Sequence, residues 1–427
     1  MTKSINAQLV EAALQHRAQA KLAKGSLGSL EAALEKRAES LPRLEPYANA
    51  LDIVNKHITV RPDDIKGASD AYIEIAERLV DKLHWSIDDI KIFPQGSVST
   101  KTLIRSPDRT KFDIDAVCGV AVDETYKENP MKFFEDVGKG LDGLVIEAKN
   151  RCWKIDAPHK PFYIEFTPSV PIDSVAIDGK GMDRRRLLAP QYRDTALAVV
   201  DRKTQQWKPS NPQGLVQWVE DASKFKLVHR IIATEAFDSA EASIERVPEQ
   251  QIGIDDSLRI AIRLFKRHRD MYVRRGHIER EFQPISVILV TLVTRMYYGL
   301  AELNRTFDHY VLLLVELATL LPHMALRLPE LGYVVGNPTI EGENFAERWN
   351  DDKGERANTF AKWCGILHSD LLSILAITDR DAIEKKAREV FGCTGESGPA
   401  GGGGGGGVPA TPANRPPPPP PRGEGLA

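Results

Sequence analysis

The alternation of apolar and polar residues changes along the chain and divides it into a mixed front half and a helical back half. From Ile5 to about Leu41, Leu, Ala and Val recur at three- and four-residue steps with charges between them, which is typical of an amphipathic helix. A second helix is predicted from Asp64 to Leu83, because "PDD" is a good capping sequence at its start.

Three later segments of the front half have the two-residue period of strands. "DIKIFPQGS" alternates and breaks at Pro94 and Gly96, "FDIDAVCGVAV" alternates and then becomes wholly apolar, and "FYIEFTPSVPI" near Phe162 does the same. Three strands near one another and flanked by helices predict a mixed sheet with helices on one face, which is an α+β fold.

The best internal boundary is residues 201–215, "DRKTQQWKPSNPQGL", because two prolines, Ser210, Asn211 and Gly214 should interrupt any regular element. Beyond it the sequence has helical periodicity almost throughout, as in "SLRIAIRLFKRHRDMY" and "HYVLLLVELATLLPHMAL". A length of 427 residues allows two substantial cores. We therefore expect a first domain over residues 1–205 and an α-helical domain over residues 206–391.

The end of the chain has a low-complexity composition, with the runs "GGGGGGG" and "PPPPPP". Such a segment has almost no large apolar side chains whose burial could offset the entropy of ordering it. Residues 392–427 are therefore predicted to be a disordered tail.

Charge and cysteine content exclude several classes of protein. Lys and Arg total 57 against 60 Asp and Glu, so the chain lacks the basic excess expected of a general DNA- or RNA-binding protein. Its four cysteines have no CxxC spacing, which argues against a disulfide scaffold and against a closed zinc site. Reduced thiols indicate a cytoplasmic protein.

No segment predicts a membrane partner. The first residues mix charges into their apolar positions and have no signal-peptide core. The longest apolar runs, "PISVILVTLV" and "HYVLLLVELATLL", are shorter than the roughly 20 residues of a spanning helix. Both are predicted to be buried helices of a soluble domain.

The strand "FDIDAVCGVAV" carries the first candidate chemistry. Residues two apart in a strand point to the same face, so Asp113 and Asp115 should project side by side while Ile114 faces the sheet's other side. Two carboxylates so placed suit Mg²⁺, which prefers oxygen ligands and is often shared with substrate phosphates. An Asp-x-Asp motif alone is weak evidence for a metal site, because solvated strand faces often carry paired acids. Here the apolar run that follows indicates that the strand enters the hydrophobic core directly after this pair.

Gly96 and Ser97 follow the preceding strand. Glycine lets a backbone approach a phosphate without a Cβ atom, and serine adds a hydroxyl donor beside the amides. A plain turn is the alternative for a lone Gly-Ser, and the sequence has no Walker-type loop.

Glu165 in "FYIEFTPSVP" is the third candidate acid, on one strand face with Tyr163 and Thr167. Any strand can carry one outward glutamate, but pairing beside the Asp113 strand would bring it to the same place. A phosphate turn and three convergent acids are the parts of a two-metal phosphoryl-transfer site.

The motifs "PQGSVSTKT", "KFDIDAVC" and "YIEFTPSVP" resemble those of the polymerase-beta-like nucleotidyltransferase superfamily. More narrowly, the chain resembles the bacterial cGAS/DncV-like nucleotidyltransferases, the CD-NTases of CBASS anti-phage systems. "WKPSNPQGLVQWVED", "LFKRHRDMY" with "PISVILVTL", and "VGNPTIEGENFAERW" are similar to later family segments, so the resemblance covers residues 53–391.

The resemblance implies an enzyme that joins nucleoside triphosphates through ribose hydroxyls, releases pyrophosphate and closes a cyclic di- or trinucleotide. It implies a nucleotidyltransferase domain over residues 1–205, with Mg²⁺ or Mn²⁺ as cofactor. The implied metal-binding and catalytic acids are Asp113, Asp115 and Glu165, and the implied nucleotide-binding residues are Gln95, Gly96, Ser97, Lys266 and Ser286. A solvated helix face for Lys266 and a buried small polar residue for Ser286 are the alternatives.

One departure from the family pattern concerns Glu165, because the family's third acid is most often aspartate. Glutamate is longer by a methylene, which can displace a metal ligand, and Asp173 is a fallback that lies past the expected strand. The chain could instead make linear oligonucleotides or modify RNA or protein, or be a catalytically inactive regulatory homologue.

The resemblance also suggests partners. The animal DNA sensor of the family has a zinc-bearing insertion, and no Cys/His cluster here corresponds to it, so no DNA activator is expected. In many such operons a ubiquitin-transfer-like enzyme conjugates the synthase through its C-terminal residue, which here is Ala427.

Overall fold

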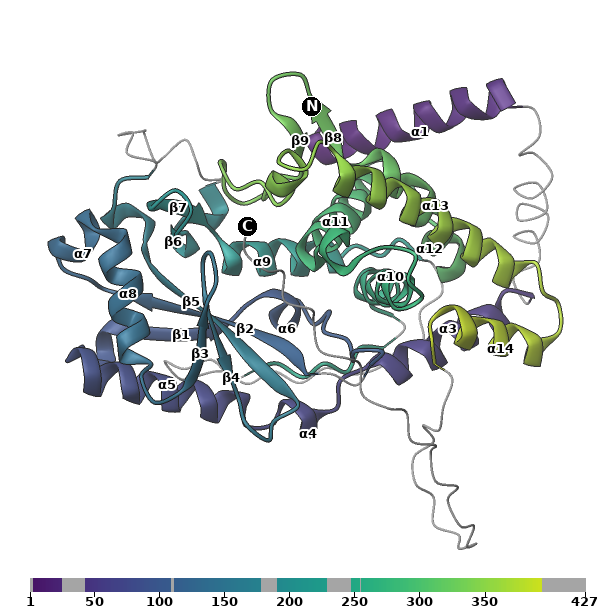
Figure 1. The fold of residues 1–427 in the computed structure, drawn as a ribbon. Helices are drawn as coiled ribbons and strands as arrows, with labels where there is room; N and C mark the ends of the chain where they lie inside the picture. Colours follow the sequence, from purple (N-terminus) through teal and green to yellow (C-terminus); the bar gives the residue numbers. More distant parts are fainter. Residues whose placement is uncertain are drawn as a thin grey trace, which may run out of the picture. The chain divides into compact units, whose positions relative to one another are not determined.

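A mixed sheet and a set of helices make up the chain in the computed structural model (Figure 1). The structure describes residues 3–24, 43–108, 111–177, 190–228, 247–253 and 255–393. The predicted α+β fold class is confirmed.

The large sheet has seven strands in the order β1-β2-β5-β4-β3, and a β6–β7 hairpin extends from β5. The strands are β1 (Ile90–Pro94), β2 (Phe112–Val120), β3 (Val145–Ala148), β4 (Trp153–Asp156), β5 (Phe162–Pro171), β6 (Leu197–Asp201) and β7 (Gln206–Ser210). β2 and β5 pair in parallel, and the other pairs of this sheet are antiparallel. A small second sheet joins β8 (Leu326–Leu328) to β9 (Gly332–Val334).

One face of the large sheet is covered by α5 (Ala68–Leu83) and α8 (Pro130–Gly140), which pack against each other. The apolar side chains of these helices and of the inward-facing strand positions form one core cluster, which includes Tyr72, Ile114, Phe133, Phe134 and Phe166. Alternation along β2 and β5 sends every second residue into this core, so the residues between them are left for the opposite face.

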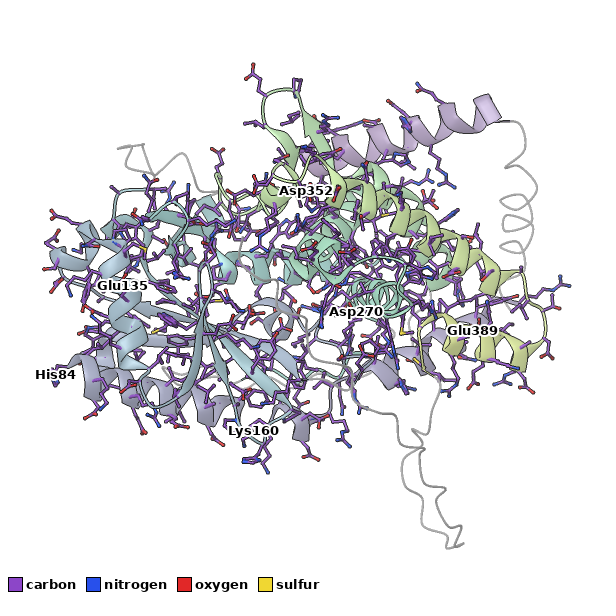
Figure 2. The ribbon with its side chains drawn as sticks, in the orientation of Figure 1. His84, Glu135, Lys160, Asp270, Asp352 and Glu389 are labelled. Carbon is purple, nitrogen blue, oxygen red and sulfur yellow. The ribbon has the colours of Figure 1, made fainter. Side chains whose placement is uncertain are left out.

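The helices of the back half form a second core cluster, together with α1 and α3 from the start of the chain. Its helices are α1 (Ile5–Lys24), α3 (Glu45–Ile58), α9 (Pro212–Ser223), α10 (Ser257–Arg274), α11 (Ser286–Glu302), α12 (Tyr310–Leu320), α13 (Glu355–Leu375) and α14 (Arg380–Val390). α1 lies along α11, and α3 packs against α14, so the start of the chain contributes to the helical core (Figure 1). The charged side chain of Glu389 lies on the outside of this half, as those of Glu135 and Lys160 do around the sheet (Figure 2).

Several short elements complete the described structure. They are α4 (Pro62–Ile65), α6 (Gly96–Ser99), α7 (Glu124–Glu128) and the 3-10 turns Ile87–Asp89, Ile172–Ser174, Pro190–Thr195, Arg280–Phe282, Leu321–His323 and Glu347–Trp349. α6 packs on β2 and also against α9 and α11, which places it where the sheet meets the helical core (Figure 1).

The prediction that residues 201–215 contain no regular element is wrong. This stretch holds β7, the turn before it and the start of α9. Pro209 is tolerated because β7 pairs with β6 alone among the described strands, and an edge strand has backbone donors to spare. Pro212 occupies the first turn of α9, where proline is favoured, and the Asn211 side chain caps that helix by accepting from the Gly214 amide.

The helix predicted from Asp64 to Leu83 is divided. α4 ends at Ile65 and α5 begins at Ala68, with Gly67 between them at a φ of +96°. That left-handed conformation suits glycine and stops the first helix. Of the helix predicted from Ile5 to about Leu41, α1 covers the part up to Lys24, and the rest lies outside the described residues.

Residues 1–394 form one compact unit, in which the two cores are in contact. The boundary between residues 205 and 206 therefore stays a prediction about domains. The prediction that the disordered tail begins at residue 392 is wrong for Gly392 and Cys393, because Cys393 is buried and both amides donate to carbonyls at the end of α14. The rest of the predicted tail, from residue 394 on, lies outside the described residues.

One described segment, Arg280–Glu302, is long and apolar enough to cross a membrane. However, 67% of its most apolar window is buried inside the protein, which is how the core helix of a soluble protein behaves. Its main part is α11, at the centre of the helical core.

Candidate active site

The candidate acids lie side by side on one face of the sheet, because β2 and β5 are neighbours in parallel register. This register places Asp115 beside Glu165 and Asp113 beside Tyr163. Ile114 and Ile164, between them in sequence, are fully buried on the other face. Asp113 is exposed, while Asp115 and Glu165 are half-buried. The chain thus brings three carboxylates to one place on the sheet.

β4 adds a cation to this row. Lys154 pairs with Glu165 across the antiparallel β4–β5 ladder, so Lys154, Glu165 and Asp115 are consecutive neighbours across three strands. The Lys154 ammonium also lies over the Tyr163 ring, 4.4 Å from its centroid. The sequence interpretation missed Lys154, because the strand that carries it is short and its partner is set by the fold.

The Gly-Ser turn packs directly against Asp115. Gly96 has a φ of +64°, and a Cβ atom there would lie 2.1 Å from Asp115 Oδ2. No side chain larger than hydrogen fits without moving this carboxylate. The Gln95 amide donates to the Asp115 carbonyl over 2.9 Å, and the Thr102 amide donates to the Ser97 carbonyl over 2.8 Å. The turn and the acid strand are therefore fixed to each other.

Gln95 contributes its side chain as well as its backbone. Its Nε2 lies 3.3 Å from the Thr167 hydroxyl on β5, on the strand face that also carries Glu165. The prediction that Gln95 binds nucleotide stays a proposal, because this contact alone would also stabilise the turn.

Lys266 reaches the turn from α10, in the helical half. Its Nζ lies 2.7 Å from Ser97 Oγ and 2.8 Å from the Thr102 carbonyl oxygen. The side chain is buried, so the alternative of a solvated helix face is wrong for this residue. Burial lowers the pKa of Lys266 to about 7, an effect that the charge of Arg269 strengthens and the charge of Asp113 opposes.

Ser286 is hydrogen-bonded to Arg269, whose charge acts on Lys266. The Ser286 hydroxyl is the acceptor for Arg269 Nη1 at 3.2 Å, and Arg269 Nη1 also donates to the Pro284 carbonyl. Ser286 is half-buried at the first residue of α11. The structure places it in the same neighbourhood as Lys266, and its binding role stays a proposal.

Two of the three carboxyl groups, Asp115 and Glu165, have raised pKa values. Burial, and then the charges of Asp113 and Glu165, raise the pKa of Asp115 well above its usual value, and Lys266 opposes this rise. Burial and Asp113 likewise raise the pKa of Glu165, against Lys149 and Lys154. The net effect in both groups is a raised pKa, so a bound cation would stabilise their ionised form.

The site offers the carboxylate oxygens of Asp113, Asp115 and Glu165 as donors for a divalent metal. Within the described residues, no group of three His, Cys, Asp or Glu side chains is spaced to enclose a metal ion. Mg²⁺, however, is commonly held by one or two carboxylates and completed by water and substrate phosphates. Asp113 and Asp115 supply such a pair of carboxylates, and a bound cation would reduce the repulsion between Asp115 and its acidic neighbours. The pair therefore fits that mode of binding.

The fallback acid is remote from this row. Asp173 lies in the 3-10 turn Ile172–Ser174, after β5 has ended, and it is exposed. It is also absent from the charges that shift the pKa values of Asp115 and Glu165. Glu165 is therefore the better candidate for the third acid.

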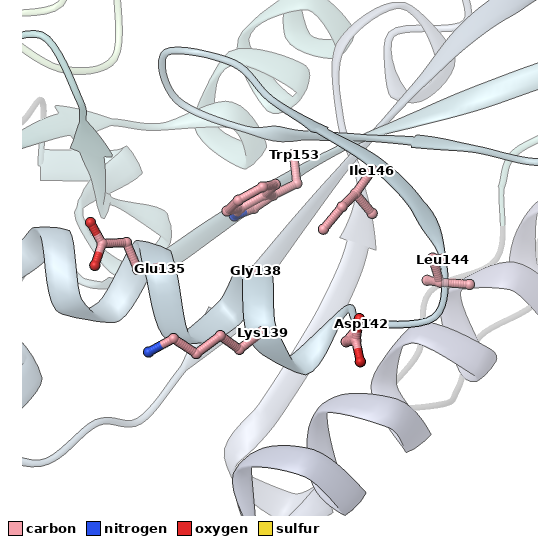
Figure 3. Close-up of a pocket in the computed structure, with 7 residues that line it drawn as sticks. All are labelled: Glu135, Gly138, Lys139, Asp142, Leu144, Ile146 and Trp153. Atoms are coloured by element: carbon pink, nitrogen blue, oxygen red, sulfur yellow. The ribbon is translucent and has the colours of Figure 1, made fainter.

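A hollow of about 420 Å³ lies on the other side of the sheet (Figure 3). It is bounded by α8 and the β3–β4 hairpin, and Trp153, Ile146 and Lys139 line it. Strand alternation sends Trp153 and Lys154 to opposite faces, so this hollow does not open onto the acids. Trp153 stacks on Phe134 and lies so close to Gly138 that a Cβ atom there would clash with it.

No protein-family model matches the chain. A curated relative, the c-di-GMP synthase of Roseivirga ehrenbergii, is 25% identical over 288 residues, which is 66% of this chain and 67% of the relative.

Solved structures are similar over more of the chain. The Bradyrhizobium diazoefficiens CD-NTase CdnG, in complex with GTP, matches with a TM-score of 0.55 and 16% identity, and the match covers 82% of this chain and 99% of CdnG. CdnC of Escherichia coli MS115-1, in a HORMA complex, matches with a TM-score of 0.50 and 11% identity over 82% of this chain and 98% of CdnC. This chain has the CD-NTase fold.

The CD-NTase fold confirms the resemblance that the motifs predicted. The match covers nearly all of CdnG, so it includes more than the sheet that carries the acids. In this fold the sheet supplies Asp113, Asp115 and Glu165, and the helical half supplies Lys266. The candidate site of this chain is thus built from both halves.

Proposed function

We propose that this chain is a nucleotidyltransferase that uses nucleoside triphosphates and Mg²⁺, or Mn²⁺, to synthesise a cyclic di- or trinucleotide second messenger. The observation that supports it best is the placement of Asp113, Asp115 and Glu165 on one sheet face, against a Gly-Ser turn that Lys266 contacts from the helical half. These are the groups that phosphoryl transfer needs, because its catalysis is mainly positioning and charge neutralisation.

The turn would hold the donor triphosphate. Ser97 and Lys266 already share a hydrogen bond, so a phosphate oxygen entering there would meet a hydroxyl and an ammonium together. Gly96 keeps this approach open, and it keeps Asp115 close to the bound phosphates. Gln95 and Ser286 lie at the borders of the same region and complete the proposed nucleotide-binding set.

The acids would hold the metal. Bound Mg²⁺ would neutralise the triphosphate and lower the pKa of the attacking hydroxyl. Asp113 and Asp115 are the proposed ligands, and Glu165 joins them. In the reaction the ribose hydroxyl oxygen bonds to the α-phosphorus, the bond from that phosphorus to the pyrophosphate oxygen breaks, and the hydroxyl proton leaves.

Glu165 is proposed to accept that proton. Its pKa is raised by burial and by Asp113, so it is a stronger base than an ordinary glutamate. Lys154, its neighbour on β4, would orient the carboxylate and balance its charge.

Guanine nucleotides are the first substrates to test. The curated relative is a c-di-GMP synthase, and CdnG was solved with GTP. The cellular role we propose is cytoplasmic anti-phage signalling of the CBASS type, without a DNA activator and without a membrane. Protein partners belong to this proposal, since CdnC was solved with a HORMA protein. Conjugation of Ala427 by a ubiquitin-transfer-like enzyme is also part of it.

Incubation of the full chain with the four NTPs and Mg²⁺ or Mn²⁺ tests the proposal. We expect pyrophosphate release and a product that resists both phosphatase and a nuclease specific for free ends, because a cyclic product has none. Mass spectrometry would identify its bases and ring size. A linear, phosphatase-sensitive product would indicate a transferase that does not close a ring. If neither metal supported turnover, the chain would instead be an inactive homologue.

The affinity for NTP is expected to weaken as the pH rises above about 7. The ammonium form of Lys266 binds phosphate, and this form is lost above its pKa of about 7. The dissociation constant of a nonhydrolysable NTP, measured by calorimetry from pH 6 to 9, should therefore rise by up to about tenfold per pH unit in the alkaline limb. Lys266→Arg keeps its charge and should flatten the profile. A wild-type dissociation constant that is constant over this range would contradict the assignment.

A further inference from the structure

Cationic side chains of α10 donate hydrogen bonds to a row of carbonyls just beyond the phosphate turn. The bonds run from Arg259 Nε to the Thr100 oxygen (2.8 Å), from Lys266 Nζ to Thr102 (2.8 Å), from Arg263 Nη2 to Leu103 (3.3 Å) and from Arg267 Nη1 to Arg105 (3.1 Å). We call these four cations the α10 row. The sequence interpretation singled out only Lys266 among them.

The spacing of the α10 row explains how one helix holds an extended segment. Arg259, Arg263, Lys266 and Arg267 recur at steps that place them on one helix face. Residues 100–105 lie against that face and are also attached to α3 on their other side. The Arg105 amide donates to the Ile58 carbonyl over 2.8 Å, and Thr59 bridges to Ile104.

Arg263 is the most deeply placed member of this row. It is 0% exposed, and its Nη2 donates both to Leu103 and to the Thr59 hydroxyl, at 3.0 Å. Within the described residues it forms no ion pair, and its Nε and Nη1 have no hydrogen-bond partner. Burial lowers its pKa to about 10.

A buried guanidinium with unsatisfied donors is costly, so packing alone gives a poor reason for it. A methionine of similar length would fill the space without that cost. The contacts that only a guanidinium provides here are those to Thr59 and Leu103, and they join the end of α3 to the segment that follows the turn.

We propose that Arg263 is a positioning residue of the phosphate turn: by fixing the backbone of residues 100–105, it holds Ser97 and the Thr102 carbonyl where Lys266 meets them. This inference rests on the proposed function for its catalytic consequence. Its structural part, rigidity of the turn, is independent of turnover. Small displacements of a positioning backbone lower rates strongly, since reacting groups must be held closely.

Hydrogen–deuterium exchange of the full chain tests the structural part. The amides of Thr100, Lys101 and Thr102 are bonded within the turn. In Arg263→Met we expect them to exchange about tenfold faster, because a hydrogen bond to a charged group is lost at the segment's anchor. Arg263→Lys, which keeps one charged donor, should restore part of the protection.

Arg295→Met is the matched control. Arg295 is also buried and donates to a backbone carbonyl, that of Gly336, but it does not contact residues 96–105 in any bond that the structure shows. Its loss should change the turn's exchange by less than the loss of Arg263, even if the unfolding midpoint falls equally. In activity assays, Arg263→Met should lower kcat/KM for NTP about tenfold, with most of the change in KM, and Arg295→Met should not.

The outcomes separate the two proposals. Unchanged exchange of residues 96–105 in a folded Arg263→Met protein overturns the positioning role, whatever the activity. Equal effects of Arg263→Met and Arg295→Met on the turn overturn it too, because they indicate general destabilisation. Wild-type protein that makes no product from NTPs overturns the proposed function and leaves the exchange result standing. If Arg263→Met does not fold, the exchange of the turn amides is compared between Arg263→Gln, Arg263→Lys and the wild type instead.

Discussion

Replacing Asp113 and Asp115 together by alanine is expected to abolish pyrophosphate release while the protein stays folded. The two carboxylates are the proposed metal ligands, and metal ions contribute several kcal/mol of charge stabilisation in such reactions. The rate should therefore fall by at least about a thousandfold. Steady-state pyrophosphate release measures the loss, and the thermal unfolding midpoint checks the fold.

Stability should move in the opposite direction from activity. The folded protein raises the pKa of Asp115 through burial and through Asp113 and Glu165, so at neutral pH, where the unfolded chain has this carboxyl ionised, Asp115 destabilises the native state. This cost disappears only as the pH falls and the carboxyl is protonated. Asp115→Asn should accordingly raise the unfolding midpoint at pH 7, and the gain should shrink in acid. A lower midpoint at pH 7 would mean that Asp115 is held by favourable contacts.

Asp173→Ala is the control for the third acid. Asp173 lies beyond the end of β5, so its loss should leave pyrophosphate release near the wild-type rate. The double mutant would contradict the site assignment if it still made product. Asp173→Ala would contradict the choice of Glu165 if it, and not Glu165→Ala, were inactive.

Gly96→Ala is expected to give the second large loss of activity. A Cβ atom at position 96 would lie 2.1 Å from Asp115 Oδ2, and the φ of +64° is unfavourable for alanine by about 1–2 kcal/mol. The Asp115 carboxylate or the turn must shift, and a shift of about 1 Å in a catalytic group can cost about a hundredfold in rate. We therefore expect kcat to fall by about that factor, measured in the same pyrophosphate assay.

Gly276→Ala separates strain from displacement. Gly276 also has a positive φ, +74°, but a Cβ atom there would meet nothing within 4 Å. Both variants should lose stability through the unfavourable φ, and only Gly96→Ala should lose activity. Equal kcat values would show that the close approach of Gly96 to Asp115 is not needed for the reaction.

The sequence predicted the sheet side of the site better than the helical side. Alternation along "FDIDAVC" places Asp113 and Asp115 on one face by geometry alone, because a strand has a fixed period of two. Asp115 and Glu165 are neighbours only because β2 pairs with β5. Alternation is compatible with this pairing but does not determine which strands pair or in which register.

The helical side depends on tertiary contacts that periodicity cannot show. "SLRIAIRLFKRHRD" predicts a helix, but its arginines are typical of a solvated face, and here they are buried against carbonyls of residues 100–105. Only the resemblance to the CD-NTases pointed to Lys266. Pro209 and Pro212 do not interrupt regular structure for a related reason, since an edge strand and a helix start both accept proline.

The parallel pairing of β2 with β5 has a consequence for how the protein is made. β3 and β4 lie between them in the sequence, so during synthesis Asp113 and Asp115 leave the ribosome well before the strand that carries Glu165. Lys266 follows later still, on α10. A nascent chain that stops before α10 therefore has no complete site, and the protein should acquire the ability to consume NTP only after its helical half has folded onto the sheet.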